Sequence, residues 1–277
     1  MSTIQTAGTI SKDLTLDCDV CVIGSGAGGG MLAAGLVERG LNVIMLEAGP
    51  YKNRADFRMN EAEAFANLYQ GRGLQATKDM SISLMQGSNV GGGTTINWTS
   101  CFRTPDEILE HWQKHFGLSA LTSSKMAPHF DAVEQRLNVS EWPLSLANAN
   151  NQVVIRGARA LNWEVSPLRR NVSGCVNSGY CGMGCPVNAK QGMLLTTIPD
   201  AIKGGMRLFA DTYAERLIVE NDRVVAVQAR VKDPSSGRPG PHQVKVHAKH
   251  VVSSCGALHG PALFLRSGIN DNGLVGR

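Results

Sequence analysis

The sequence predicts an α/β fold built around a Rossmann-like dinucleotide-binding domain, and three observations support this prediction. A short apolar run, Cys18–Ile23, suits a strand that is buried on both faces. Three glycines follow it at the spacing G-x-G-x-x-G, namely Gly24, Gly26 and Gly29. A second apolar run then ends at Glu47, about 20 residues after the first glycine. This order of strand, glycine turn, helix, strand and acidic residue indicates a protein that binds an adenine dinucleotide.

Each part of this unit has a physical role. The first glycine allows the tight turn, the second lets the backbone approach a pyrophosphate, and the third lets the helix pack on the strand. The helix, expected over Ala27–Arg39, directs its N-terminus at the phosphates. The second strand is expected over Asn42–Glu47, and the carboxylate of Glu47 is expected to bind a ribose hydroxyl. On these residues alone the dinucleotide could be FAD or NAD.

The rest of the chain divides into a helical part and a strand-rich part. Helices are expected over residues 105–116, 125–137 and 150–161. From Met206 to Val252 the pattern changes to strands, which are expected over residues 207–214, 215–220, 223–231 and 244–252, with a hairpin loop over residues 233–241 between the last two. The sequence therefore predicts inserted helices and a small antiparallel sheet in addition to the dinucleotide unit.

Composition and charge exclude several classes of protein. Hydrophobic residues make up 43% of the 277 residues and charged residues 18%, which indicates a globular protein. The net charge of +4 forms no basic stripe, so nucleic-acid binding is not expected. No N-terminal secretory signal and no apolar run long enough for a transmembrane segment is evident. The expected location is therefore cytoplasmic.

Three segments together resemble the glucose–methanol–choline (GMC) family of FAD-dependent oxidoreductases. Val43–Pro50 reads VIMLEAGP, and Gly91–Asn97 is similar to the family's glycine-rich flavin segment, with Gly93 in place of the usual serine. Val251–Asn270 is similar to the family's second signature, although Gly260 replaces the usual Ser or Thr and the last residue is Asn instead of Gly. The resemblance extends over nearly the whole chain.

The resemblance implies a cofactor, a reaction and a set of binding residues. The cofactor is FAD, which accepts hydride from the CH–OH group of an alcohol while a histidine base takes the hydroxyl proton. The FAD-binding domain is expected over residues 17–277, after an N-terminal extension over residues 1–16. The expected cofactor-binding residues are Gly24, Gly26, Gly29 and Glu47 at the ADP half, Gly91, Gly92, Thr94 and Asn97 along the pyrophosphate and flavin, and Ala214 at the adenine.

The resemblance also implies that catalytic residues and most of the substrate domain lie outside this sequence. None of the seven histidines matches the family's catalytic motif. We therefore expect the chain to be the N-terminal part of an alcohol dehydrogenase or oxidase and to be inactive alone. Two alternatives stay open at this point: a non-catalytic flavin or iron–sulfur electron-transfer module, and an NAD-dependent dehydrogenase.

A cysteine-rich loop over residues 174–190 permits two interpretations. Cys175, Cys181 and Cys185 have the spacing C-x5-C-x3-C, which suits thiolate ligation of a soft metal, either in an iron–sulfur cluster of three irons or in an open zinc site. The loop is similar to that of bacterial FAD-dependent glucose and gluconate dehydrogenases, which hold a 3Fe-4S cluster, and to one in long-chain alcohol oxidases. The first interpretation is a cluster on these cysteines that passes electrons to a cytochrome or quinone at the inner-membrane surface. The second is a loop of packed thiols.

Overall fold

The computed structural model describes residues 3–277, and these residues form two compact units. The first unit contains the residues up to Asn97 together with Asn177–Asn188 and Gly192–Arg277. The second contains Trp98–Val176 and Ala189–Gln191. The predicted dinucleotide-binding strands, glycine turn and helix all belong to the first unit.

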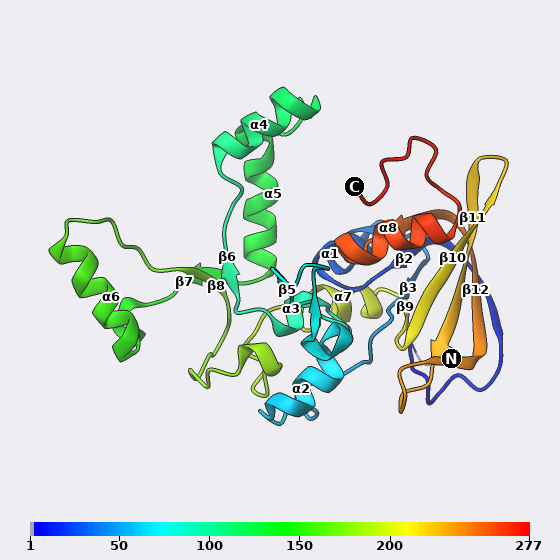
Figure 1. Ribbon diagram of the computed structural model, residues 1–277, viewed down its shortest axis with the longest axis horizontal. Coiled ribbons are helices and arrows are strands. Elements are labelled where there is room, and N and C mark those ends of the chain that lie inside the picture. The colour runs from blue at the N-terminus through cyan, green and yellow to red at the C-terminus, as the bar shows by residue number, and fades with distance from the viewer. Residues whose placement is uncertain (1–2) are drawn as a thin grey trace. The chain divides into compact units, whose positions relative to one another are not determined.

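The first unit is organised by a seven-stranded sheet with the order β1-β9-β3-β2-β12-β11-β10 (Figure 1). Its strands are β1 (Ile4–Gln5), β2 (Leu14–Ile23), β3 (Val43–Leu46), β9 (Arg207–Phe209), β10 (Thr212–Glu220), β11 (Arg223–Lys232) and β12 (Pro239–Ser253). The five strands from β1 to β12 in this order run parallel to their neighbours, whereas β11 pairs antiparallel with both β12 and β10. The predicted α/β fold with a parallel sheet is confirmed.

The predicted antiparallel sheet is present as the meander β10–β11–β12. It is continuous with the parallel sheet because β12 pairs with β11 on one edge and with β2 on the other. The sequence predicts one strand from residue 207 to residue 214, but the structure divides it into β9 and β10. The chain turns at Asp211, which has a φ of 52° and donates its backbone N–H to the carbonyl oxygen of Gly49.

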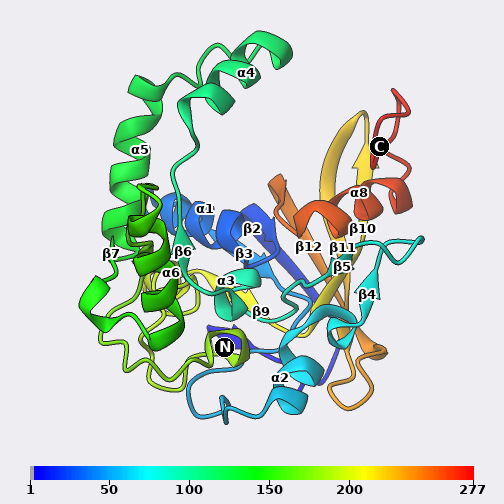
Figure 2. The same cartoon turned by 60° about the vertical axis from the view of Figure 1, so that its left-hand side comes forward.

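Helices and short strands complete the first unit. They are α1 (Ala27–Glu38), α2 (Glu61–Leu68), α3 (Gly93–Ile96), α7 (Thr197–Lys203), α8 (Gly256–Arg266), the 3-10 turns η1 (Gln70–Gly73) and η3 (Cys181–Met183), and the hairpin strands β4 (Gln75–Ala76) and β5 (Ser83–Leu84). Helix α1 lies along β2 and β3 (Figure 2) and packs against α7, while α8 packs against β10. The predicted helix and the two predicted strands of the dinucleotide unit are therefore all present.

The segment predicted as an N-terminal extension contributes to the main sheet. Met1 and Ser2 lie outside the described residues, but β1 pairs with β9, and β2 begins at Leu14, four residues before the predicted strand. This early part of β2 alternates between exposed and buried side chains. Thr15 and Asp17 are exposed, whereas Leu16 and Cys18 are buried. Such alternation is typical of a strand with one solvated face, unlike the continuous apolar run that follows.

The second unit is a three-stranded antiparallel sheet with three helices. The sheet has the order β6-β8-β7. The elements are β6 (Ser100–Cys101), α4 (Asp106–Phe116), α5 (Ser123–Arg136), β7 (Val139–Glu141), the 3-10 turn η2 (Leu144–Leu146), α6 (Ala149–Ala160) and β8 (Arg169–Asn171). The three predicted helices are confirmed, with ends that differ by one or two residues. Within residues 3–277, no helix combines the length and apolar character that crossing a membrane requires.

The two cysteines of β2 are core residues. Cys21 is completely buried and Cys18 is 8% exposed. Burial raises the pKa of the Cys18 thiol from 9.0 to about 11 and also raises the pKa of Cys21. Because a thiolate is the reactive form of cysteine, both side chains should be chemically inert in the folded protein.

This burial leads to a labelling prediction. At pH 8, the raised pKa lowers the thiolate fraction of Cys18 about 100-fold relative to an ordinary thiol. Cys18 and Cys21 should therefore react with Ellman's reagent only after unfolding in guanidinium chloride. The measurement is mass-spectrometric mapping of labelled peptides under native and denaturing conditions. Rapid native labelling of the peptide that contains both residues would contradict the described core.

Candidate functional site

A cavity of about 730 Å³ lies in the first unit, at the carboxyl ends of the parallel strands. The last residue of β2, Ile23, and the last residue of β3, Leu46, both line it, as does Ser254 directly after β12. Ligands of open α/β sheets bind at this edge. The volume falls within the range of about 300–1,000 Å³ that is usual for cofactor and small-molecule sites.

The predicted glycine turn forms one wall of this cavity. The backbone N–H of Gly24 donates to the carbonyl oxygen of Leu46 at 2.8 Å, which joins the turn to the end of β3. Gly26 is the N-cap residue of α1, and a Cβ atom built on it would have no neighbour within 4 Å. The N–H groups in the first turn of a helix have no acceptor within the helix. The bare backbone and these donors together suit a bound anion.

The third glycine brings α1 close to the turn. A Cβ atom on Gly29 would overlap the carbonyl oxygen of Gly24 and would lie 3.2 Å from the Cβ of Ser254. Only a residue without a side chain fits between these two backbone segments. Gly29 therefore acts through packing, and it does not line the cavity.

Glu47 lies just after β3, lines the cavity and is 7% exposed. Its Oε2 accepts hydrogen bonds from the backbone N–H of Ser25 at 2.9 Å and from the Ser25 hydroxyl at 2.6 Å. Its Oε1 accepts a hydrogen bond from the backbone N–H of Gly49 at 2.8 Å. Burial raises the pKa of this carboxyl, and these hydrogen bonds and the charge of Lys232 act in the opposite direction. A carboxylate with two oxygens retains acceptor capacity beyond three hydrogen bonds.

The second glycine segment closes against the first. Gly92 has a φ of 54°, and a Cβ atom on it would lie 2.9 Å from the Cα of Gly26. The backbone N–H of Gly91 donates to the hydroxyl oxygen of Ser25 at 2.9 Å. Segments that are some 65 residues apart in the chain therefore meet at one wall of the cavity, as the resemblance in sequence implies.

Several predicted residues lie beside this wall without lining the cavity. The Thr94 hydroxyl donates to the carbonyl oxygen of Gly91 at 2.6 Å and accepts the backbone N–H of Met193 at 3.0 Å. Asn97 is exposed at the end of α3. Of the nine residues predicted to bind the cofactor, those lining the cavity are Gly24, Gly26, Glu47, Gly92 and Ala214. Cofactor contacts of all nine residues stay predictions.

Other parts of the cavity lining are side chains that the sequence did not identify. Next to Ala214, the Tyr213 ring lies 5.3 Å from the guanidinium carbon of Arg266 and meets the His259 ring edge-on at 6.4 Å. Burial, with smaller effects of Arg266 and Lys232, lowers the pKa of His259, which favours the neutral imidazole. Lys232 donates to the carbonyl oxygen of Ala48 at 2.9 Å. Aromatic and cationic side chains of this kind suit a nucleotide base and its phosphates.

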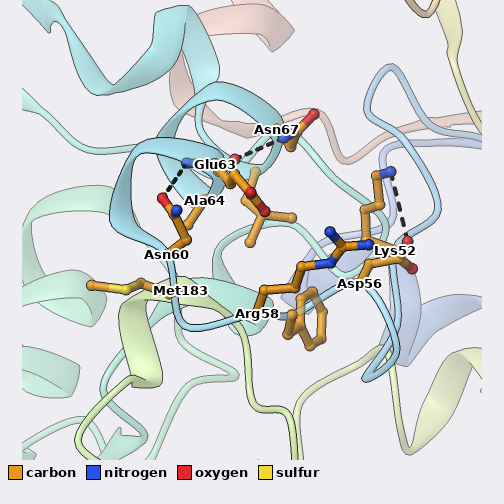
Figure 3. A pocket seen from close by; sticks show the side chains of 10 residues that line it. Lys52, Asp56, Arg58, Asn60, Glu63, Ala64, Asn67 and Met183 are labelled. Atoms are coloured by element: carbon orange, nitrogen blue, oxygen red, sulfur yellow. Dashed lines mark hydrogen bonds and ion pairs between the residues drawn. The ribbon is translucent and has the colours of Figure 1, made fainter.

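A second and smaller cavity of about 200 Å³ lies at the start of α2 (Figure 3). The Asn60 side chain accepts the backbone N–H of Glu63 at 3.1 Å, and the Asn67 side chain donates to the carbonyl oxygen of Glu63 at 2.8 Å. Lys52 and Asp56 form an ion pair at 3.8 Å. The polar groups drawn in Figure 3 therefore serve largely to cap and stabilise local backbone. The larger cavity is the better candidate for a dinucleotide site.

The cysteine-rich loop is divided between the units. Cys181 and Cys185 belong to the first unit and Cys175 to the second, and each is half-buried. Among residues 3–277, no group of three or more His, Cys, Asp or Glu side chains is arranged to hold a metal ion. The iron–sulfur interpretation has no support in this arrangement.

Comparison with known proteins identifies relatives of both the sequence and the fold. The family model described as GMC oxidoreductase matches residues 65–277. The chain is 35% identical over 262 residues to an uncharacterized GMC-type oxidoreductase of Sinorhizobium fredii, covering 94% of this chain and 51% of the relative. It is 31% identical over 271 residues to a long-chain-alcohol oxidase of Arabidopsis thaliana, covering 94% of this chain and 35% of the relative. The chain thus spans about half or less of the length of these relatives.

Solved structures share the fold at low sequence identity. Pyridoxine 4-oxidase from Mesorbium loti matches with a TM-score of 0.68 and 19% identity, covering 91% of this chain and 52% of that one. Formate oxidase from Aspergillus oryzae matches with a TM-score of 0.65 and 14% identity, covering 94% of this chain and 48% of that one. These similarities support the architecture described above.

Proposed function

This chain belongs to the GMC oxidoreductase family, and from this premise we propose that its 730 Å³ cavity binds FAD for the oxidation of an alcohol. The single observation that supports this most strongly is the meeting of the two glycine segments at the cavity wall. Gly92 approaches Gly26 so closely that a side chain on Gly92 would displace the Gly26 backbone. Both segments leave bare backbone on the same side, where a diphosphate would contact it.

The residues present fit each part of the cofactor. The N-terminus of α1, at Gly26, offers N–H groups to a diphosphate. Glu47 offers a buried carboxylate to the hydroxyls of the adenosine ribose. Ala214, 6% exposed at the start of β10, offers backbone at the position where the family resemblance implies the adenine.

Bound FAD would supply the hydride acceptor for the carbinol carbon of the substrate. This chain would hold the cofactor, orient it and keep water from the nucleotide half. None of its histidines matches the family's catalytic motif, so we propose that proton removal from the alcohol depends on residues outside this sequence. Relatives named long-chain-alcohol oxidase make an alcohol with a CH–OH group the favoured substrate class.

Cofactor identity can be tested by calorimetric titration of the purified protein with FAD, FMN and NAD. We expect one-to-one binding of FAD and at least about 100-fold weaker binding of NAD, a difference of about 2.7 kcal/mol. FMN should bind weakly because it lacks the adenosine and one of the two phosphates. At a free FAD concentration of about 100 times its Kd, the free energy of unfolding should rise by about 2.7 kcal/mol.

Two other outcomes would change the proposal. Binding of NAD as tight as that of FAD would favour an NAD-dependent dehydrogenase. A broad visible absorption besides the flavin bands, in protein purified without oxygen, would favour an electron-transfer module with an iron–sulfur cluster.

A further inference from the structure

Ser25 occupies the variable position inside the glycine turn, and it is completely buried. Its hydroxyl donates to Oε2 of Glu47 at 2.6 Å and accepts the backbone N–H of Gly91 at 2.9 Å. Its own backbone N–H donates to the same carboxylate oxygen at 2.9 Å. One small side chain therefore joins the glycine turn, the acidic residue after β3 and the second glycine segment.

These contacts restrict the orientation of the Glu47 carboxylate. Two donors from Ser25 bind one oxygen, and the Gly49 N–H binds the other at 2.8 Å. Hydrogen bonds to a charged acceptor are roughly twice as strong as neutral ones. The carboxylate is consequently held in one rotamer before any ligand arrives, and its remaining lone pairs are left for a ligand in the cavity it lines.

The same hydroxyl also fixes the distance between the two glycine segments. Without it, the Gly91 N–H would lose its acceptor, and no other described hydrogen bond holds Gly91 to the turn. Leaving a buried N–H without a partner is destabilising. Gly92, which lies close to Gly26, is the next residue in the chain after Gly91.

We infer that Ser25 is a positioning residue for ribose recognition, because it orients Glu47 toward the ribose hydroxyls and ties the second glycine segment to the turn. This inference rests on the proposed function, since it takes Glu47 as the group that binds the ribose. Ser25 also lines the cavity, but its hydroxyl binds Glu47 and Gly91, so we take its effect on the ribose to act through Glu47.

The test compares two small probes, ADP and 2′,3′-dideoxy-ADP, by calorimetric titration of wild-type protein and of Ser25→Ala. The ratio of their dissociation constants measures how much the ribose hydroxyls contribute. In the wild type we expect ADP to bind about 10- to 100-fold more tightly than the dideoxy probe. In Ser25→Ala we expect this ratio to fall below about 3-fold, because Glu47 loses the shortest of the three hydrogen bonds that orient it.

Two control variants separate orientation from general disruption. Ser267→Ala removes a half-buried serine hydroxyl that accepts the Leu217 N–H and donates to the Leu263 carbonyl oxygen. Ser267 does not line the cavity, so this variant should keep the wild-type ratio. When Ser25→Ala is added to Glu47→Gln, the ratio of the two dissociation constants should fall no further. The reason is that Ser25 influences this ratio only through the Glu47 carboxylate, which Glu47→Gln has already removed. Ser25→Gly provides a second variant without the hydroxyl, and like Ser25→Ala it keeps the backbone N–H that donates to Glu47.

The possible results distinguish the inference from its premise. A wild-type protein that binds both probes equally would overturn the ribose role of Glu47. A wild type that discriminates, together with Ser25→Ala and Ser25→Gly variants that bind both probes more weakly at an unchanged ratio, would show that Ser25 is only structural. A ratio that falls below about 3-fold in both Ser25 variants, but stays at the wild-type value in Ser267→Ala, would support the inference.

Discussion

Replacing Gly29 by alanine should abolish measurable FAD binding and lower the free energy of unfolding. The new methyl group would overlap the carbonyl oxygen of Gly24, so the turn and the start of α1 must move apart. Overpacking of this kind costs about 1–3 kcal/mol. The displaced turn would also lose the shape that meets a diphosphate, and we expect FAD affinity to fall at least about 100-fold. Urea unfolding and FAD titration measure the two effects.

Gly35→Ala is the matched control for this variant. It changes a glycine of the same helix, but its Cβ atom would meet only the flexible end of Arg39, at 3.4 Å. Alanine favours a helix interior over glycine by about 1 kcal/mol, so this variant should be as stable as the wild type or more stable. Its FAD affinity should be unchanged. Wild-type FAD binding by Gly29→Ala would show that the described turn is wrong.

Replacing Glu47 by glutamine should weaken FAD binding about 10- to 100-fold, because it removes the charge from a buried acceptor. Three N–H or O–H groups point at this side chain, two from Ser25 and one from Gly49. The glutamine amide nitrogen would face a donor and could not accept it. Fluorescence titration with FAD measures the loss. Asp17→Asn, an exposed change on β2, should leave the affinity unchanged.

Glu47→Gln should also change how the free energy of unfolding depends on pH. Burial raises the pKa of Glu47 above its ordinary value of 4.5, so the folded protein keeps this proton to higher pH than the unfolded chain does. The contribution of Glu47 to the free energy of unfolding therefore falls as pH rises from 4.5 through the raised pKa. Asp211, whose pKa burial also raises, is present in both proteins and cancels in the difference. We expect the free energy of unfolding of the wild type minus that of Glu47→Gln to fall with pH over this range. A rise in this quantity would contradict the prediction.

The elements that could be predicted from the sequence are those whose signal is local. The turn between β2 and α1 is determined by glycine spacing, and β3 by a four-residue apolar run that is entirely buried. The start of β2 was not predicted, because alternation around Leu16 is a weaker signal than a continuous apolar run. The break between β9 and β10 was not predicted either, because Leu208–Phe209 before Asp211 and Thr212–Tyr213 after it are residue types that suit strands.

The candidate site could likewise be predicted only where its residues carry a local sequence signal. The two glycine segments and Glu47 are recognisable from residue type and spacing, whereas Tyr213, Lys232 and Arg266 carry no such signal. They reach the cavity because the meander β10–β11 and helix α8 bring them there through long-range pairing. Ser25 occupies a position that the G-x-G pattern leaves open to any residue, so its three hydrogen bonds could be found only in the structure.

The central claim is that the two glycine segments and Glu47 together hold the nucleotide half of FAD. A crystal structure of the protein with FAD tests it most directly. We predict that the diphosphate contacts backbone N–H groups at the start of α1, between Gly26 and Gly92, with the adenosine ribose hydroxyls hydrogen-bonded to Glu47. FAD bound elsewhere at full occupancy, with its diphosphate away from both glycine segments, would contradict the claim.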